Sequence, residues 1–372
     1  MDYERGDKQV MKKKLCIAPF TKGEIGILNL LSDKYEISYL VSPLGIGIDD
    51  IDISYLSNES KKGFVGNSDL ENSVKNSDII FVSNANEQLR YYGILALENA
   101  LIFKKKVICF MKLNEAEKSS YIRRFTELDI DIEFFEAMKI NDKEFQNSSY
   151  SKIEVPVLFV GETISNCDSF EVFTKLIYKF KASGKNILAF SENTYTNLYN
   201  QQSIIFPENN NFERSIINLN AYINKQVIQN HPDVIIIHLP CPMTKFSDNV
   251  HYDFGLSAYF ISQAITADYL IYCMPLNLIS KELIDNMSQS FSSKFGVDIS
   301  YVHLSNQILD YSYEDTEHNV QVSFDSFGKN SLLAQLLRKD GTSVYNLLDD
   351  NDYIKFNNQI EQEMFNLPFG VI

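Results

Sequence analysis

One stretch decides how the second half of this chain folds: residues 155–180, VPVLFVGETISNCDSFEVFTKLIYKF. Residues 155–160 form an apolar, β-rich run of strand length, and residues 169–182 carry apolar side chains at helical spacing. Between them lies a polar loop that begins with Gly161 and ends before Ser169. A buried strand, a loop and a helix in this order are the context of a P-loop, whose backbone N–H groups cradle phosphate.

The loop keeps the frame of the P-loop motif GxxxxGK(S/T) but not its charge. Aligned on Gly161, the second glycine position is Asn166, the lysine position is Cys167 and the Ser/Thr position is Asp168. Without the lysine, a bound triphosphate lacks its mobile cation, and Asp168 adds negative charge in its place. We therefore predict a degenerate Walker A loop that does not hydrolyse ATP efficiently. The residues expected to line its ligand site are Gly161, Thr163, Ser165, Asn166, Cys167, Asp168 and Ser169.

A purely structural interpretation of Asp168 and Ser169 remains open. Both residue types cap helix N-termini, which stabilises a helix by about 1 kcal/mol. Helix capping explains this pair well, but it does not explain the whole loop between a buried strand and a helix.

A second strand, residues 233–239 (DVIIIHL), occupies the place of the Walker B strand. No carboxylate follows it until Asp248, so the sequence shows no Mg²⁺ ligand there. His238 lies within the apolar run, and we expect a buried or strand-end histidine rather than a ligand. If the two strands are neighbours, their loops place Cys167 and Cys241 on one edge of the sheet. Such a thiol pair would bind a soft metal, undergo redox chemistry or hold a cysteine-rich peptide, and two unrelated loop cysteines are the alternative.

Strands and helices alternate along the first half as well, which indicates a parallel sheet with helices on both faces. A polar, pattern-free stretch at residues 141–153 marks the expected domain boundary. We predict an α/β fold with two doubly wound, mostly parallel-sheet, Rossmann-like domains, of which the second is P-loop-NTPase-like. The predicted ranges are residues 1–145 for the N-terminal domain, 146–310 for the second domain and 311–372 for a C-terminal helical extension.

The charge of the chain disfavours one class of partner. Lys and Arg number 34 against 49 Asp and Glu, and the net charge of −15 would repel a phosphate backbone, so we expect no nucleic-acid binding. No run reaches the ~18 apolar residues of a membrane span, and no signal peptide is visible. The five cysteines lack CxxC or zinc-finger spacing. These features predict a cytoplasmic protein without a membrane partner.

Residues 161–171, 232–240 and 254–264 resemble the clostridial-type peptide maturation system proteins. That family is associated with gene clusters for ribosomally made, cysteine-containing peptides that also contain radical SAM enzymes. More distantly, the second domain is similar to the dethiobiotin-synthetase-like group of P-loop proteins. The resemblance implies a precursor peptide or a radical SAM-type maturation enzyme as the partner.

We therefore expect an accessory protein in the maturation of such a peptide, which binds peptide, partner enzyme or a small ligand at the cleft between its domains. The alternative is a nucleotide- or metal-dependent enzyme that uses the loop of Cys167 and Asp168. The sequence does not decide whether the cofactor is a nucleotide or a soft metal. It also does not decide whether the protein forms a homo-oligomer.

Overall fold

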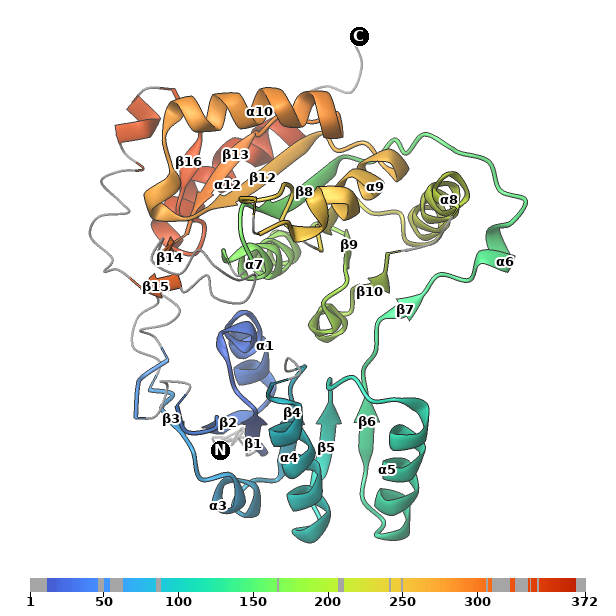
Figure 1. Cartoon of the computed structure of the whole chain (residues 1–372), viewed down its shortest axis with the longest axis vertical. Helices are drawn as coiled ribbons and strands as arrows, with labels where there is room; N and C mark the ends of the chain where they lie inside the picture. Colours follow the sequence, from blue (N-terminus) through green and yellow to red (C-terminus); the bar gives the residue numbers. More distant parts are fainter. Residues whose placement is uncertain are drawn as a thin grey trace, which may run out of the picture. The chain divides into compact units, whose positions relative to one another are not determined.

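The computed structural model divides into two compact units, Met1–Glu136 and Ala137–Ile372, and each is described by itself (Figure 1). Both units are α/β, with mostly parallel sheets and alternating helices, as predicted. The residues that the structure describes are 12–45, 50–53, 63–84, 88–165, 167–206, 211–240, 242–248, 250–305, 307–309, 322–324, 334, 336–339 and 341–365.

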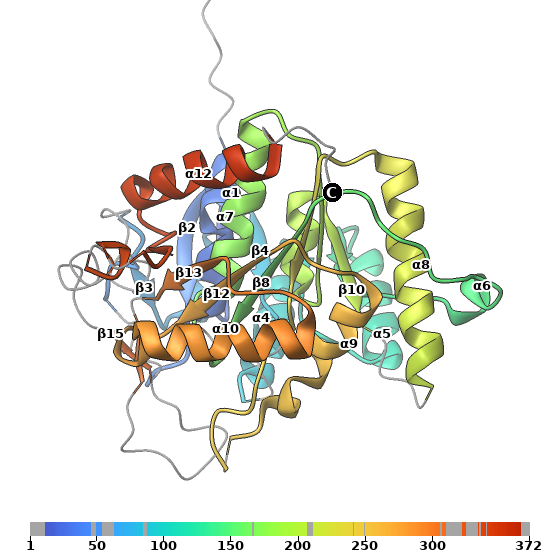
Figure 2. The same ribbon diagram turned by 90° about the horizontal axis from the view of Figure 1, so that it is seen from above.

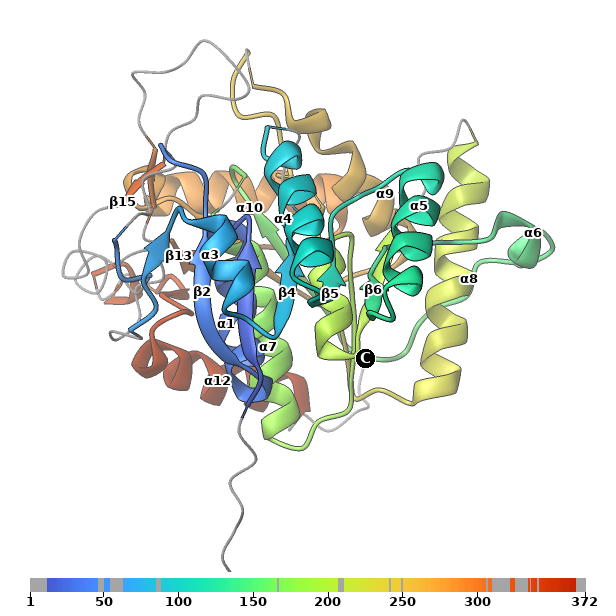
Figure 3. The same cartoon turned by 90° about the horizontal axis from the view of Figure 1, so that it is seen from below.

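The first unit holds a six-stranded parallel sheet in the order β3-β2-β1-β4-β5-β6, which is the strand order of a Rossmann fold. Crossovers between parallel strands are right-handed, so α1 lies on one face and α3, α4 and α5 on the other (Figure 3). The elements are β1 Lys14–Ala18, η1 Lys22–Glu24, α1 Ile25–Lys34, β2 Glu36–Val41, β3 Gly66–Asn67, α3 Leu70–Lys75, β4 Ile79–Val82, α4 Arg90–Ile102, β5 Lys106–Cys109, α5 Glu115–Glu127 and β6 Ile132–Phe134.

Local sequence explains why these elements begin where they do. Asn114 accepts the Glu117 N–H at the start of α5, and Glu117 accepts the Asn114 N–H in return, which makes a capping box. The four residues of β4 are all buried, as expected for a central strand that is covered on both faces.

The second unit holds an eight-stranded parallel sheet in the order β16-β13-β12-β8-β11-β9-β10-β7. Strand β8 lies near the middle, and the chain adds strands first on one side of it and later on the other. The strands are β7 Met138–Lys139, β8 Val157–Glu162, β9 Ile187–Ser191, β10 Gln202–Ile205, β11 Val234–His238, β12 Tyr269–Met274, β13 Tyr301–Leu304 and β16 Val344–Tyr345.

Helices cover both faces of this sheet. Figure 2 shows α7 and α12 on one face and α9 and α10 on the other. The core on the face of α9 and α10 includes Phe159, Leu219 and Phe291. The helical elements are α6 Asp142–Phe145, α7 Ser169–Ala182, η2 Thr194–Tyr199, α8 Phe212–Asn230, η3 Tyr252–Gly255, α9 Leu256–Ala264, η4 Leu276–Leu278, α10 Lys281–Phe295 and α12 Asp350–Phe365. A separate antiparallel pair consists of β14 Gln307–Leu309 and β15 Val322–Phe324.

The division between the units lies earlier than the predicted boundary at residue 145. Strand β7 pairs with β10 of the second sheet, and Lys225 of α8 forms an ion pair with Glu144 of α6. The predicted C-terminal helical extension contains helix α12, but it also contributes strand β16, which joins the second sheet beside β13. Within the part of the chain that the structure describes, no helix has the length and apolar character needed to cross a membrane.

Candidate functional site

The predicted strand-loop-helix is present at the centre of the second sheet. Strand β8 ends at Glu162, and α7 begins at Ser169. The two neighbours of β8 are β11, the strand compared with Walker B, and β12. The chain crosses from one side of β8 to the other between β11 and β12, and open α/β sheets bind ligands at such a switch point. The described loop residues 163–165 and 167–168 therefore lie at the preferred ligand edge of this sheet.

Polar side chains form a row along this edge, on the sheet face that α7 covers. Because paired residues of parallel strands point to the same face, the register aligns Glu162 with Cys273 and Cys273 with His303. His238 aligns with Val160, two residues before Glu162, so it shares that face. Ser191 continues the row on β9, one position beyond the aligned pair of Ile237 and Phe190. The row in sheet order is His303, Cys273, Glu162, His238 and Ser191.

Three members of this region form a directed hydrogen-bond relay with Ser169. Its hydroxyl lies 2.8 Å from Glu162 Oε2 and 3.0 Å from His238 Nε2, and His238 Nδ1 lies 3.0 Å from Ser191 Oγ. A carboxylate only accepts, so the Ser169 hydroxyl donates to Glu162 and accepts from His238 Nε2–H. His238 Nδ1 then accepts from the Ser191 hydroxyl. All donors of the relay therefore point toward Glu162.

Burial keeps the histidine of the relay neutral. His238 is 9% exposed and packs against the rings of Phe170 and Phe173. Desolvation lowers the pKa of His238 from 6.5 to about 4. The prediction of a buried strand-end histidine is confirmed, and its contact with Ser169 was not predictable from the spacing.

Two N–H groups of the loop, in the region that cradles phosphate in a P-loop, have acceptors within the chain. Thr163 N–H donates to the Cys273 carbonyl at 3.0 Å, and Cys167 N–H donates to Glu162 Oε2 at 3.0 Å. Tyr252 forms hydrogen bonds with the backbone and the side chain of Ser165. Burial is the main influence on the pKa of Tyr252 and raises it, whereas these hydrogen bonds lower it. A carboxylate of the protein therefore takes an N–H at the position where a P-loop binds phosphate.

Tyr252 reaches the loop from a left-handed turn that sequence reasoning missed. Tyr252, Asp253, Phe254 and Gly255 have φ angles of 43°, 51°, 58° and 69°. Left-handed backbone costs roughly 1–2 kcal/mol for each residue other than glycine. Asp253 offsets part of this by accepting the N–H groups of Gly255 and Ser257 at 2.9 and 3.0 Å, where α9 begins. The only sequence signal for this turn is weak: Gly255 stands directly before a helical pattern.

Asp168 does not make the capping hydrogen bond that the structural interpretation expects. It occupies the N-cap position of α7 with φ of 67° and makes no side-chain capping hydrogen bond. Its carboxylate instead accepts the Ser305 hydroxyl and lies 3.6 Å from His303 Nε2. Asp168 therefore connects the start of α7 to the end of β13.

Two predicted site residues, Asn166 and Cys241, lie outside the described residues, so the proposed Cys167–Cys241 pair stays a prediction. Cys167 is buried, and its charge is among the influences that raise the pKa of Cys273, after the larger effect of burial. Among the described residues, no group of three or more His, Cys, Asp or Glu could hold a metal ion. Gly161 has a packing role, because a Cβ there would lie 2.6 Å from Met243 Sδ.

No family model and no curated protein sequence matches this chain. A solved DUF1611 family protein from Anabaena variabilis superposes with a TM-score of 0.57 at 8% identity, covering 95% of this chain and 98% of that chain. The kinase domain of the Escherichia coli tyrosine kinase ETK gives a TM-score of 0.30 at 12% identity over 48% of this chain and 74% of its own. An Archaeoglobus fulgidus nucleotide-binding protein in complex with ADP gives 0.34 at 11% identity, covering 63% and 98%.

The similarity to the DUF1611 family protein extends over nearly the whole of both chains and shows a shared fold. At this level of identity it says nothing of a shared activity. The resemblance to peptide maturation proteins has no support from a family model and stays a prediction.

Proposed function

We propose that the second unit binds a positively charged group of a peptide at the carboxyl end of its sheet, as an accessory protein in peptide maturation. One observation carries this proposal. The Glu162 carboxylate accepts the Cys167 N–H within the P-loop-like turn. A turn that already holds an anion of its own has less capacity for the phosphates of a nucleotide.

The charge around the turn favours a cationic ligand. Residues 161–169 contain no lysine or arginine, and two carboxylates, Glu162 and Asp168, belong to this segment. Glu162 is only partly buried, and the chain as a whole has a net charge of −15. Ammonium and guanidinium groups form their strongest hydrogen bonds with carboxylates, and a negative field draws them from solution. A precursor peptide, or the radical SAM-type enzyme that modifies it, would supply such groups.

Calorimetric titration with two cysteine-containing peptides of equal length tests the proposal. We expect binding of a lysine-rich peptide, weakened by salt, and no binding of the same peptide with glutamate in place of lysine. Glu162→Gln keeps the shape of the side chain and removes its charge, and we expect at least about tenfold weaker binding.

Glu213→Gln is the matched control, because this substitution removes the same charge at a different place, the first turn of α8. Equal affinities of the wild type and Glu162→Gln for the lysine-rich peptide would contradict the proposal. So would tight binding of ATP, ADP or GTP by the wild-type protein.

The alternative is a nucleotide- or metal-dependent enzyme that uses the loop of Cys167 and Asp168. The buried relay from Ser191 through His238 to Ser169 favours this candidate, because such a chain can move a proton toward Glu162. Titration with nucleotides and elemental analysis of anaerobically purified protein test it. Negative results in both measurements would remove this candidate.

A further inference from the structure

Four large apolar side chains are exposed where α9 begins. Leu256 and Tyr259 lie three residues apart on α9, so they share one side of the helix. Phe254 directly precedes the helix, and Phe212 at the start of α8 extends the surface, because its ring lies 6.3 Å from that of Phe260 on α9. The exposed fractions of Phe212, Phe254, Leu256 and Tyr259 lie between 42% and 64%. We call these four residues the α9 surface.

The backbone that presents Phe254 to solvent is strained. Phe254 belongs to the run of four residues with left-handed φ angles, a conformation that bulky side chains rarely adopt. Its ring stacks on His251 at a centroid distance of 4.9 Å, yet Phe254 is exposed rather than part of the core. Strained backbone persists where other contacts enforce it, and it is concentrated at ligand sites. The turn therefore holds an aromatic ring toward solvent, and burial of that ring does not offset the strain.

Contacts on three sides fix this turn beside the candidate loop. Tyr252 forms hydrogen bonds with the backbone and the side chain of Ser165. Lys294 Nζ of α10 donates to the Phe254 carbonyl at 2.9 Å. Asp253 accepts two backbone N–H groups where α9 begins. The position of the exposed ring is therefore set by the loop, by α10 and by α9.

The turn also lies within electrostatic reach of Glu162. Burial is the main influence that raises the pKa of Tyr252, and the negative charge of Glu162 raises it further. The two opposite charges of the turn act on each other: burial lowers the pKa of Lys294, and Asp253 raises it. A carboxylate and an apolar surface therefore adjoin at the carboxyl end of this sheet.

We propose that the α9 surface binds an apolar side chain of the same peptide whose cationic group binds at Glu162. This inference rests on the proposed function and adds a second determinant to it, an aromatic or aliphatic residue close to a lysine or arginine of the peptide. A second copy of this chain is a poorer partner, because two chains with a net charge of −15 repel each other. A basic peptide is attracted by the same field and gains affinity by removing apolar surface from water.

Calorimetric titration with four peptides of equal length tests the inference. The peptides combine lysine or glutamate at the charged positions with phenylalanine or serine at one neighbouring position. With lysine present, we expect phenylalanine to strengthen binding to the wild type at least about fivefold. This gain should persist at high salt, whereas the contribution of lysine should weaken, because salt screens charges and not apolar contacts.

Two double variants remove different parts of the α9 surface. Phe254→Asn/Leu256→Gln removes the exposed ring and places at residue 254 an asparagine, which tolerates left-handed backbone. Leu256→Gln/Tyr259→Gln changes helix positions only, so it tests the surface without altering the strained turn. In both variants we expect the gain from phenylalanine to fall below about twofold, because the peptide side chain loses its apolar contacts.

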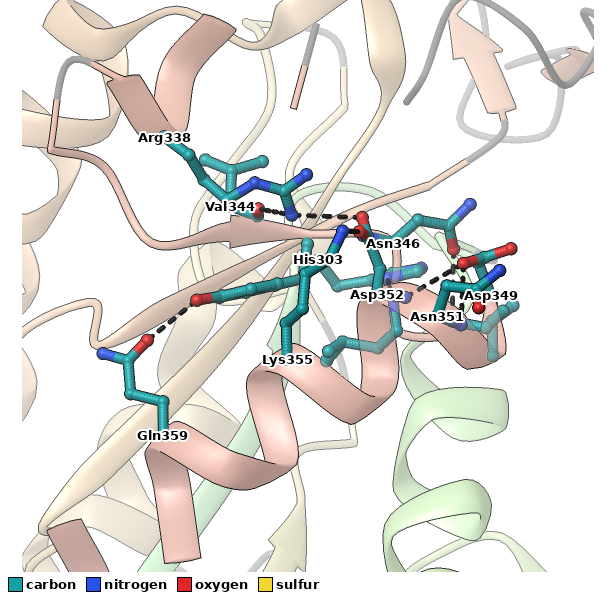
Figure 4. A network of polar contacts seen from close by, with 12 residues as sticks. His303, Arg338, Val344, Asn346, Asp349, Asn351, Asp352, Lys355 and Gln359 are labelled. Carbon is teal, nitrogen blue, oxygen red and sulfur yellow. Dashed lines mark hydrogen bonds and ion pairs between the residues drawn. The ribbon is translucent and has the colours of Figure 1, made fainter. Parts of the chain in front are cut away.

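Ile354→Gln is the matched control. Ile354 is 58% exposed on α12, which lies on the opposite face of the sheet from α9 (Figure 2). The start of α12 is held by Asp352, which accepts Arg338 Nη1 at 3.2 Å and Lys355 Nζ at 3.0 Å (Figure 4). The control should therefore keep both the fold and the full gain from phenylalanine.

Absence of a gain from phenylalanine in the wild type, or an equal gain in the wild type and both double variants, would overturn the inference. Binding of the peptide with lysine and serine would in that case leave the proposed function intact. Equal binding of the two phenylalanine peptides, with lysine or with glutamate, would reject the proposed function, and loss of that binding in the double variants would still support the α9 surface. Self-association of the wild type in sedimentation that both double variants abolish would identify a second copy as the occupant and overturn the inference.

Discussion

The hydroxyl of Ser169 lies 2.8 Å from Oε2 of Glu162, where the first turn of α7 meets the end of β8. A serine in the first turn of such a helix usually forms a hydrogen bond with the helix backbone or with a ligand. The hydroxyl of Ser169 instead donates to a carboxylate at the end of a strand. The same oxygen of Glu162 also accepts the Cys167 N–H. The carboxylate at the end of β8 therefore connects this strand with the loop and with the first residue of α7. The stability of the loop and its preference for ligands therefore depend on one side chain.

Ser169→Ala should destabilise the protein by about 1–3 kcal/mol, because it leaves the buried His238 Nε2–H without its acceptor. The free energy of unfolding from urea titration measures this change. Ser293→Ala on α10, whose hydroxyl donates to the Gln289 carbonyl at 3.1 Å on an exposed surface, is the control and should change it by less than about 0.5 kcal/mol. An equally small change in Ser169→Ala would show that the relay contributes nothing to stability.

The burial of His238 should make stability depend on pH in a defined window. The pKa of His238 in the folded protein is about 4, below its ordinary value of 6.5, so the unfolded chain binds a proton at higher pH than the folded protein does. The contribution of neutral His238 is therefore complete above pH 6.5, falls as the pH drops and is lost by about pH 4. The shift corresponds to roughly 3 kcal/mol.

Urea titrations of the wild type and His238→Gln across this window isolate the effect from that of other groups. The wild type should lose more stability than the variant as the pH falls. Parallel losses in the two proteins would mean that His238 has the same affinity for protons in the folded and unfolded states.

The strand-loop-helix and its place in the sheet could be predicted because they depend on local patterns. A β-rich apolar run, a polar loop and a helical repeat adjoin in the sequence, and His238 ends a run whose other members are apolar. The turn at residues 252–255 could not be predicted, because tyrosine and phenylalanine disfavour left-handed backbone and tertiary contacts impose it.

Contacts that join distant parts of the chain were missed for a similar reason. Strand β16 has only two residues, Val344 and Tyr345, and no sequence pattern identifies a strand of that length. Its partner His303 therefore could not be linked with Asp168 before the pairing was known. Strand β7 is equally short, which is why the polar stretch after it was interpreted as the boundary.

Gly255→Ala should destabilise the protein more than Gly184→Ala. Both glycines have positive φ, 69° and 82°, but a Cβ on Gly255 would lie 2.0 Å from the Met243 carbonyl oxygen, whereas a Cβ on Gly184 meets nothing within 4 Å. Backbone strain alone costs roughly 1–2 kcal/mol, and overpacking adds about 1–3 kcal/mol at Gly255 only. Unfolding in urea compares the two variants. Equal losses would indicate that the backbone around Met243 yields without cost.

Removal of Glu162 should open the turn to phosphate. In Glu162→Ala the Cys167 N–H loses its acceptor and one negative charge leaves the loop, so the N-terminus of α7 regains a donor for an oxyanion. We expect millimolar inorganic phosphate to raise the melting temperature of Glu162→Ala and to leave that of the wild type and of Glu213→Gln unchanged. The binding should remain weak, because no lysine is present in the loop to neutralise the phosphate. An equal response of all three proteins to phosphate would show that Glu162 does not occupy the anion position, and the argument against a nucleotide at this loop would lose its basis.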